Sequence, residues 1–137
     1  MSDLIKIIAS KKFPKIEFSL REDGIMNVII LSHPELLTMH DLFETMQWVE
    51  SLGENQYLNL YEGDFSSVDA EVRAQISSDN ANQYTIADAF VVQNISDTML
   101  GDFYLKFNKP VKPTRKFDNR EKAIEWLLEQ KEDLSNK

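Results

Sequence analysis

Residues 16–31, IEFSLREDGIMNVIIL, decide the fold because they predict two strands joined by a tight turn. Apolar and polar residues alternate over 16–20, which is typical of a strand with one buried face. Asp23 and Gly24 follow, and this dipeptide favours a hairpin because glycine tolerates the positive φ of a tight turn. Residues 25–31 are nearly all apolar, so we expect the second strand to be buried on both faces.

Outward from this hairpin, helical and strand patterns alternate. Thr38 and Asp41 form a capping pattern that opens a helix over residues 39–52, and Gly53 ends it. We expect the buried stripe of this helix to be Met39, Leu42, Phe43, Met46 and Val49. Further strands are predicted at 56–62, 87–92 and 114–117, the last at a sheet edge. Further helices are predicted from Ser66 or Ser67 towards Tyr84, from Ser96 to Phe107, and from Asp118 onward, with Ala123, Ile124, Leu127 and Leu128 buried in the last.

This order predicts an α/β fold. After the N-terminal β-hairpin, alternating strands and helices imply a mixed, mostly parallel sheet of about five strands with four helices on its faces. A chain of 137 residues is the size of one domain, and we expect an ordered core over about 14–132.

Composition excludes several classes of function. The chain has no cysteine, so disulfides and thiolate chemistry are excluded. The net charge of −8 argues against nucleic acid as the main partner. The only apolar stretch near the N-terminus, residues 4–9, is short and contains Lys6, so we expect no signal peptide, no membrane insertion and a cytoplasmic location.

The charges are distributed unevenly along the sequence. Residues 35–102 hold 13 acidic residues and one basic residue, Arg73. Residues 106–116 hold five basic residues and no acidic one, and Lys6, Lys11, Lys12 and Lys15 form a second basic group. Two explanations of this uneven charge remain open. The charged residues either cover solvated faces and compensate helix dipoles, or they form an electrostatic docking surface.

The C-terminal third of the chain resembles a known group of proteins. The segments that carry this resemblance are ADAFVV at 87–92, MLGDFYLKFNKP at 99–110, PTRKF at 113–117 and AIEWLL at 123–128. They are similar to small free-standing bacterial STAS/Sec14-like proteins of undefined function, which share the fold of anti-sigma-factor antagonists. The first two thirds match only in element order. The resemblance implies a STAS-like domain.

The resemblance also implies a regulatory serine that this chain lacks at the expected place. STAS antagonists carry an Asp-Ser-Ser-Gly-like motif at the start of the helix after the third strand. Here Asp69 could match the aspartate of the motif, but Ala70 and Glu71 then stand at the serine positions. Ser66 and Ser67 are the nearest hydroxyls, and helix capping accounts for them as well as a regulatory role does.

No catalytic, metal or cofactor site is recognisable. His40 and Glu44 are spaced four apart, which could hold a metal, but the sequence favours a surface ion pair. His33 could act as a base, yet no nucleophile motif, P-loop or dinucleotide fingerprint accompanies it.

Residues off the predicted core faces are candidate partner contacts. Trp48 lies outside the apolar stripe of its predicted helix, and Trp126 lies at the flank of its own. A tryptophan in such a position either contacts a partner or is covered by a neighbouring segment of the chain. The basic residues Lys109, Lys112, Arg115 and Lys116 are the other candidates, facing an acidic surface on a partner or on a second copy.

These observations favour a non-enzymatic regulatory or protein-interaction domain that binds a protein partner or forms a homodimer. A carrier or sensor of a small apolar ligand or lipid is the alternative, suggested by Phe103, Tyr104 and Phe107 and by the Sec14-like resemblance. A hydrolase using His33 or His40 is the third hypothesis.

Overall fold

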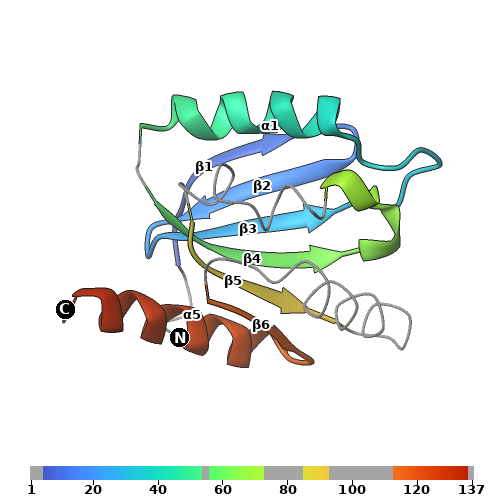
Figure 1. The fold of residues 1–137 in the computed structure, drawn as a ribbon. Coiled ribbons are helices and arrows are strands. Elements are labelled where there is room, and N and C mark those ends of the chain that lie inside the picture. The colour runs from blue at the N-terminus through green and yellow to red at the C-terminus, as the bar shows by residue number, and fades with distance from the viewer. Residues whose placement is uncertain (1–4, 54–55, 73–84, 93–112, 136–137) are drawn as a thin grey trace.

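The computed structural model describes residues 5–53, 56–72, 85–92 and 113–135, which build one six-stranded sheet with helices on both faces (Figure 1). The strands are β1 (Ile7–Lys12), β2 (Ile16–Arg21), β3 (Ile25–Ile30), β4 (Tyr57–Gly63), β5 (Thr85–Val91) and β6 (Thr114–Phe117). They lie across the sheet in sequence order. The pairs β1–β2 and β2–β3 are antiparallel and the pairs from β3 to β6 are parallel, so the predicted mixed, mostly parallel α/β sheet is confirmed.

The predicted hairpin joins β2 to β3. Gly24 has a φ of 92°, and its N–H donates to the carbonyl of Arg21 at 3.0 Å. The Asp23 carboxylate accepts from the Ile25 N–H and pairs with the Arg21 guanidinium at 2.7 Å. The turn is therefore closed by main-chain and side-chain bonds together.

Strand β1 was not predicted, and it is why the sheet has six strands rather than about five. Its side chains are exposed except at Ala9, which is half-buried. An alternating apolar pattern arises only where one face of a strand is buried, so the sequence carried no strand signal here. The expected ordered core of 14–132 begins after this strand.

Two α-helices and one short 3₁₀ helix lie wholly within the described residues, and residues 70–72 are the described start of a further helix. The complete helices are α1 (Met39–Ser51), η1 (Phe65–Ser67) and α5 (Arg120–Ser135). Helix α1 lies over one face of the sheet and α5 lies against the other (Figure 1). The helix expected over 96–107 and the continuation of another over 73–84 lie outside the described residues.

Helix α1 begins as predicted, but its buried face is rotated. The Asp41 N–H donates to the Thr38 hydroxyl, and the Asp41 carboxylate accepts from the Thr38 N–H, which completes the capping box. Thr45 and Val49 are buried, whereas Phe43, predicted to be buried, is 63% exposed. Thr45 can occupy the core-facing position because its hydroxyl donates to the Leu42 carbonyl at 2.8 Å.

Helix α5 is capped one residue later than predicted. The side-chain oxygen of Asn119, not that of Asp118, accepts from the Lys122 N–H at 3.0 Å, because the first helical residue is Arg120. Ala123 and Leu127 are fully buried, and Ile124 and Leu128 are partly buried beside them, as the predicted stripe requires. The helix packs on β4, β5 and β6.

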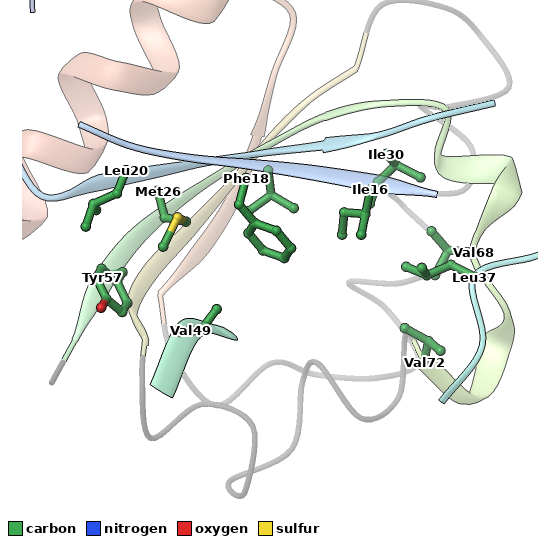
Figure 2. Packing of buried hydrophobic residues seen from close by; sticks show 11 residues of the cluster. Ile16, Phe18, Leu20, Met26, Ile30, Leu37, Val49, Tyr57, Val68 and Val72 are labelled. Carbon is green, nitrogen blue, oxygen red and sulfur yellow. The ribbon is translucent and has the colours of Figure 1, made fainter. Parts of the chain in front are cut away.

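Two apolar clusters hold these layers together. The first joins the α1 face of β2 and β3 to Val49, Leu37, Tyr57, Val68 and Val72 (Figure 2). Figure 2 shows the side chains of Ile16, Phe18 and Met26 directed to one side of the sheet, where Val49 of α1 also lies. The second cluster joins Leu58 and Leu60 of β4 and the apolar residues of β5 to α5. Strand β4 contributes to both, so it is the centre of the fold.

Candidate functional site

The predicted hydroxyls Ser66 and Ser67 both donate to one carboxylate. Asp64 follows β4 at its carboxyl end, and its side chain accepts from the hydroxyls of Ser66, Ser67 and Ser32 and from the Ser66 N–H. The hydrogen bond from Ser66 is the main reason that the pKa of Asp64 lies below its ordinary value. Ser66 is exposed and Ser67 is buried. The cluster therefore caps η1 and ties it to the segment after β3.

The helix start that follows η1 is capped by Asp69 and not by either serine, contrary to the prediction. The Glu71 N–H donates to the Asp69 carboxylate at 2.8 Å, and Ala70 is the first helical residue. A carboxylate thus already occupies the N-cap, where anions are favoured. A phosphate on Ser66 would meet the Asp64 carboxylate, so the local charge opposes phosphorylation there.

The two tryptophans contact the apolar clusters. Trp48 is half-buried, and its ring lies 5.5 Å from that of Phe18. Trp126 lies 5.7 Å from the ring of Phe117 and packs against the second cluster. These contacts favour packing roles for both rings, and contact with a partner stays a prediction.

The predicted basic surface is described only at β6. Arg115 is exposed, with its guanidinium 5.0 Å from the centre of the Phe117 ring, and Lys116 is half-buried. Lys109 and Lys112 lie outside the described residues. Phe103, Tyr104 and Phe107, on which the carrier hypothesis rests, also lie outside them.

The histidines make local contacts. His40 and Glu44 form the expected surface pair at 3.0 Å, with both side chains exposed. The Nδ1 atom of His33 accepts from the Glu35 N–H at 3.0 Å, so it helps to close a turn. Within the described ranges, no three His, Asp or Glu side chains gather closely enough to hold a metal ion. None of the helices there is long and apolar enough to cross a membrane.

A buried polar cluster on β4 and β5 was missed by the sequence analysis. The Asn59 amide donates to the Asp88 carboxylate and to the Thr85 hydroxyl, each at 3.0 Å. Asp88 is 1% exposed, and burial raises its pKa to about 7 despite the hydrogen bond from Asn59. The sequence ADAFVV carries a signal, because an aspartate inside a buried strand requires a polar partner.

A second polar network joins α5 to the sheet. Arg120 donates to the carboxylate of Glu62 and to the side-chain oxygen of Asn27, each at 3.2 Å. The Asn27 amide donates to Glu62 at 2.9 Å and to the Leu60 carbonyl. At the other end of the helix, Lys131 donates to the Asp23 carbonyl at 3.1 Å. Polar contacts to the sheet therefore flank the buried stripe of α5 at both ends.

The outer edge of β1 combines exposed apolar and basic residues. Ile7 and Ile8 are 49% and 56% exposed, and Lys11 and Lys12 follow them on the same strand. The register shifts between Ile7 and Ala9. Ile7 pairs opposite Arg21, whose side chain points away from that of buried Leu20, so Ile7 lies on the sheet face that α1 does not cover. In the described part of the chain, no strand pairs with the outer side of β1.

The comparisons identify a family but not an activity. A family model described as a domain of unknown function, DUF7793, matches residues 18–131. The chain belongs to this family. The DUF7793 match begins inside β2 and ends inside α5, so β1 precedes the matched residues. A crystal structure of a protein with unknown function from Arthrobacter sp. FB24 is similar at 22% identity, covering 80% of this chain and 90% of that chain with a TM-score of 0.29. No curated protein matches.

Proposed function

We propose that this DUF7793 protein is a non-enzymatic protein-interaction or regulatory domain of the STAS-like type. The alternation of strands and helices after the first hairpin supports the STAS-like part, together with the resemblance of the C-terminal third. The interaction part is supported by the exposed surface of β1.

One observation carries the proposal: two consecutive isoleucines of an edge strand are about half exposed. Ile7 and Ile8 are 49% and 56% exposed, and Ile5, just before them, is 37% exposed. Full burial of an exposed isoleucine contributes roughly 1.5–3 kcal/mol, so leaving these side chains half exposed forgoes about half of that for each. Exposed apolar residues that lie near one another mark interaction surfaces more often than isolated ones do. A binding partner that covers β1 would recover this free energy.

The function is tested by affinity purification of the tagged full-length protein from its native cells. We expect a defined partner to be retained by the wild type and lost from the double variant Ile7→Lys/Ile8→Lys, because charged side chains disrupt an apolar contact. Phe43→Lys is the matched control, since Phe43 is also exposed but lies on α1.

The outcomes of this purification test both the interaction function and the role of β1 as the binding surface. Retention by the wild type and by Phe43→Lys, with loss in the double variant, supports the proposal. If no protein is enriched above an empty tag, the interaction function is wrong. If the double variant keeps the same partner, β1 is not the binding surface.

A further inference from the structure

The main-chain groups along the edge of β1 point in directions that the hairpin fixes. The Phe13 N–H donates to the Ile16 carbonyl at 2.8 Å, which makes these two residues a hydrogen-bonded pair. Hydrogen-bonded and non-hydrogen-bonded pairs alternate along an antiparallel ladder. The next bonded pairs are therefore Lys11 with Phe18 and Ala9 with Leu20.

The same alternation directs the N–H and C=O groups of Ser10 and Lys12 away from β2. Both residues are exposed, and the edge of β1 faces no other strand of the described chain. Such an edge is a template onto which another strand can pair. The edge therefore offers main-chain donors and acceptors beside the exposed Ile7 and Ile8 side chains.

The charges on this edge oppose pairing with a second copy and favour an acidic strand. Lys6, Lys11 and Lys12 are exposed, and β1 contains no acidic residue, although the whole chain has a net charge of −8. Pairing of β1 with β1 of a second copy would bring together the four lysines of the two strands, with Lys6 just before each strand, and like-charge repulsion opposes this. The exposed lysines attract an acidic strand, although two acidic residues lie close by: Glu17 pairs opposite Lys12, and the Glu22 carboxylate accepts from the Lys6 N–H.

We infer that β1 binds an extended, acidic segment of a partner protein as an added strand of the sheet. This inference rests on the proposed interaction function and names its binding mode. Main-chain hydrogen bonds to Ser10 and Lys12 hold the added strand. The lysines select acidic side chains, and the isoleucines contact apolar residues that alternate with them.

The probe is an eight-residue peptide of alternating Glu and Val with blocked ends, titrated into the full-length protein and followed by amide hydrogen exchange. We expect the amides of Ser10 and Lys12 to become protected, while those of Ala9 and Lys11, already directed to β2, change little. The apparent affinity falls as salt is added, because the lysines are exposed to solvent. A matched peptide of alternating Lys and Val should not bind.

Two variants at one position separate edge pairing from loss of fold. Ser10→Pro removes the outward N–H and leaves the ladder to β2 intact, since proline is tolerated at such edge positions. We expect it to weaken the Glu/Val peptide by about tenfold, whereas Ser10→Ala binds as the wild type does. Unchanged circular dichroism and thermal unfolding of both variants show that the fold is retained.

Several results would overturn the inference. They are equal binding of the two peptides, binding without protection of Ser10 and Lys12, and concentration-dependent protection in the absence of peptide, which would identify a second copy as the occupant. A native partner retained equally by Ser10→Pro and Ser10→Ala would sink the edge-pairing mode and leave the interaction function standing.

Discussion

At the scale of single residues, Asp88 is an ionisable group buried in the core. Its side chain is almost completely buried, at 1% exposed, and its carboxylate accepts a hydrogen bond from the Asn59 amide. Burial raises the pKa of Asp88 to about 7, so near neutral pH the folded protein still holds a proton that an exposed aspartate would have released. The stability of the fold is therefore linked to pH through this side chain.

The sign of this linkage follows from the two pKa values. The unfolded chain releases the Asp88 proton near pH 4, and the folded protein releases it near pH 7. Between these values the folded state binds more protons, so the free energy of unfolding falls as the pH rises, by up to about 4 kcal/mol. Below pH 4 this contribution is fully favourable.

Asp88→Asn should remove this slope, because an asparagine cannot ionise and can still accept from Asn59. We expect the variant to be more stable than the wild type at pH 8 and to show little of the decline between pH 4 and 7. Urea unfolding at several pH values measures both effects. Asp118→Asn is the control, since it changes an exposed aspartate by the same charge. An unchanged slope in Asp88→Asn would contradict the assignment.

At the scale of elements, strands and helix starts were predicted where local chemistry decides them. The hairpin of β2 and β3 follows from alternation and from Gly24, and the α1 cap follows from Thr38 and Asp41. The buried face of α1 was predicted wrongly, because hydrophobicity alone favours Phe43 over Thr45. A hydroxyl that bonds to its own helix makes threonine compatible with a core position, and hydrophobic periodicity does not record this.

The candidate site was less predictable than the fold. Ser66 was identified from the sequence as a hydroxyl near a helix start, but its engagement with Asp64 depends on the path of the loop. The Ile7 and Ile8 surface was missed because residues exposed on both faces of a strand leave no period-two signal. A strand is an exposed edge only when no other strand or helix packs on it. This depends on the arrangement of the whole sheet and not on the local sequence.

Two glycines at the ends of elements both have a positive φ, but only Gly63 lies against another strand. Comparing substitutions at the two positions therefore tests how closely β3 and β4 approach each other. Gly63 ends β4 with a φ of 108°, and a Cβ added there would lie 2.1 Å from the Ile30 carbonyl oxygen. Gly53 follows α1 with a φ of 79°, and beyond its chain neighbours no heavy atom of the described residues lies within 4 Å of its added Cβ. We expect Gly53→Ala to lower the free energy of unfolding by about 1 kcal/mol through backbone strain alone.

Gly63→Ala should cost about 3 kcal/mol or more, because the same strain is joined by a main-chain clash that requires β3 and β4 to separate. Urea unfolding of the two variants at one pH measures the difference directly. Equal destabilisation would mean that β4 can move away from Ile30 at little cost.

At the scale of the whole molecule, β1 and α5 contribute unequally to the buried core. Helix α5 buries Ala123 and Leu127 against β4 and β5, and its ends are held by Arg120 and Lys131. Strand β1 adds a ladder to β2 but contributes only Ala9, half-buried, to the first cluster. The fold therefore depends on α5 and only weakly on β1.

Removal of residues 1–12 should leave a folded protein. Each ladder hydrogen bond of β1 contributes about 0.5–1.5 kcal/mol, and ordering each of its residues costs about 1–2 kcal/mol, so the two terms nearly cancel. We expect the truncated chain to unfold cooperatively in urea with a free energy of unfolding lowered by less than about 2 kcal/mol. It should no longer bind the Glu/Val peptide, because the edge that pairs with it is gone.

Removal of residues 120–137 is the contrasting variant, and we expect it to be unfolded, because the apolar α5 face of β4 and β5 loses its cover. A truncated chain that lacks β1 and is unfolded would show that this strand holds the fold together, and the exposed isoleucines would then need a structural explanation instead of a binding one.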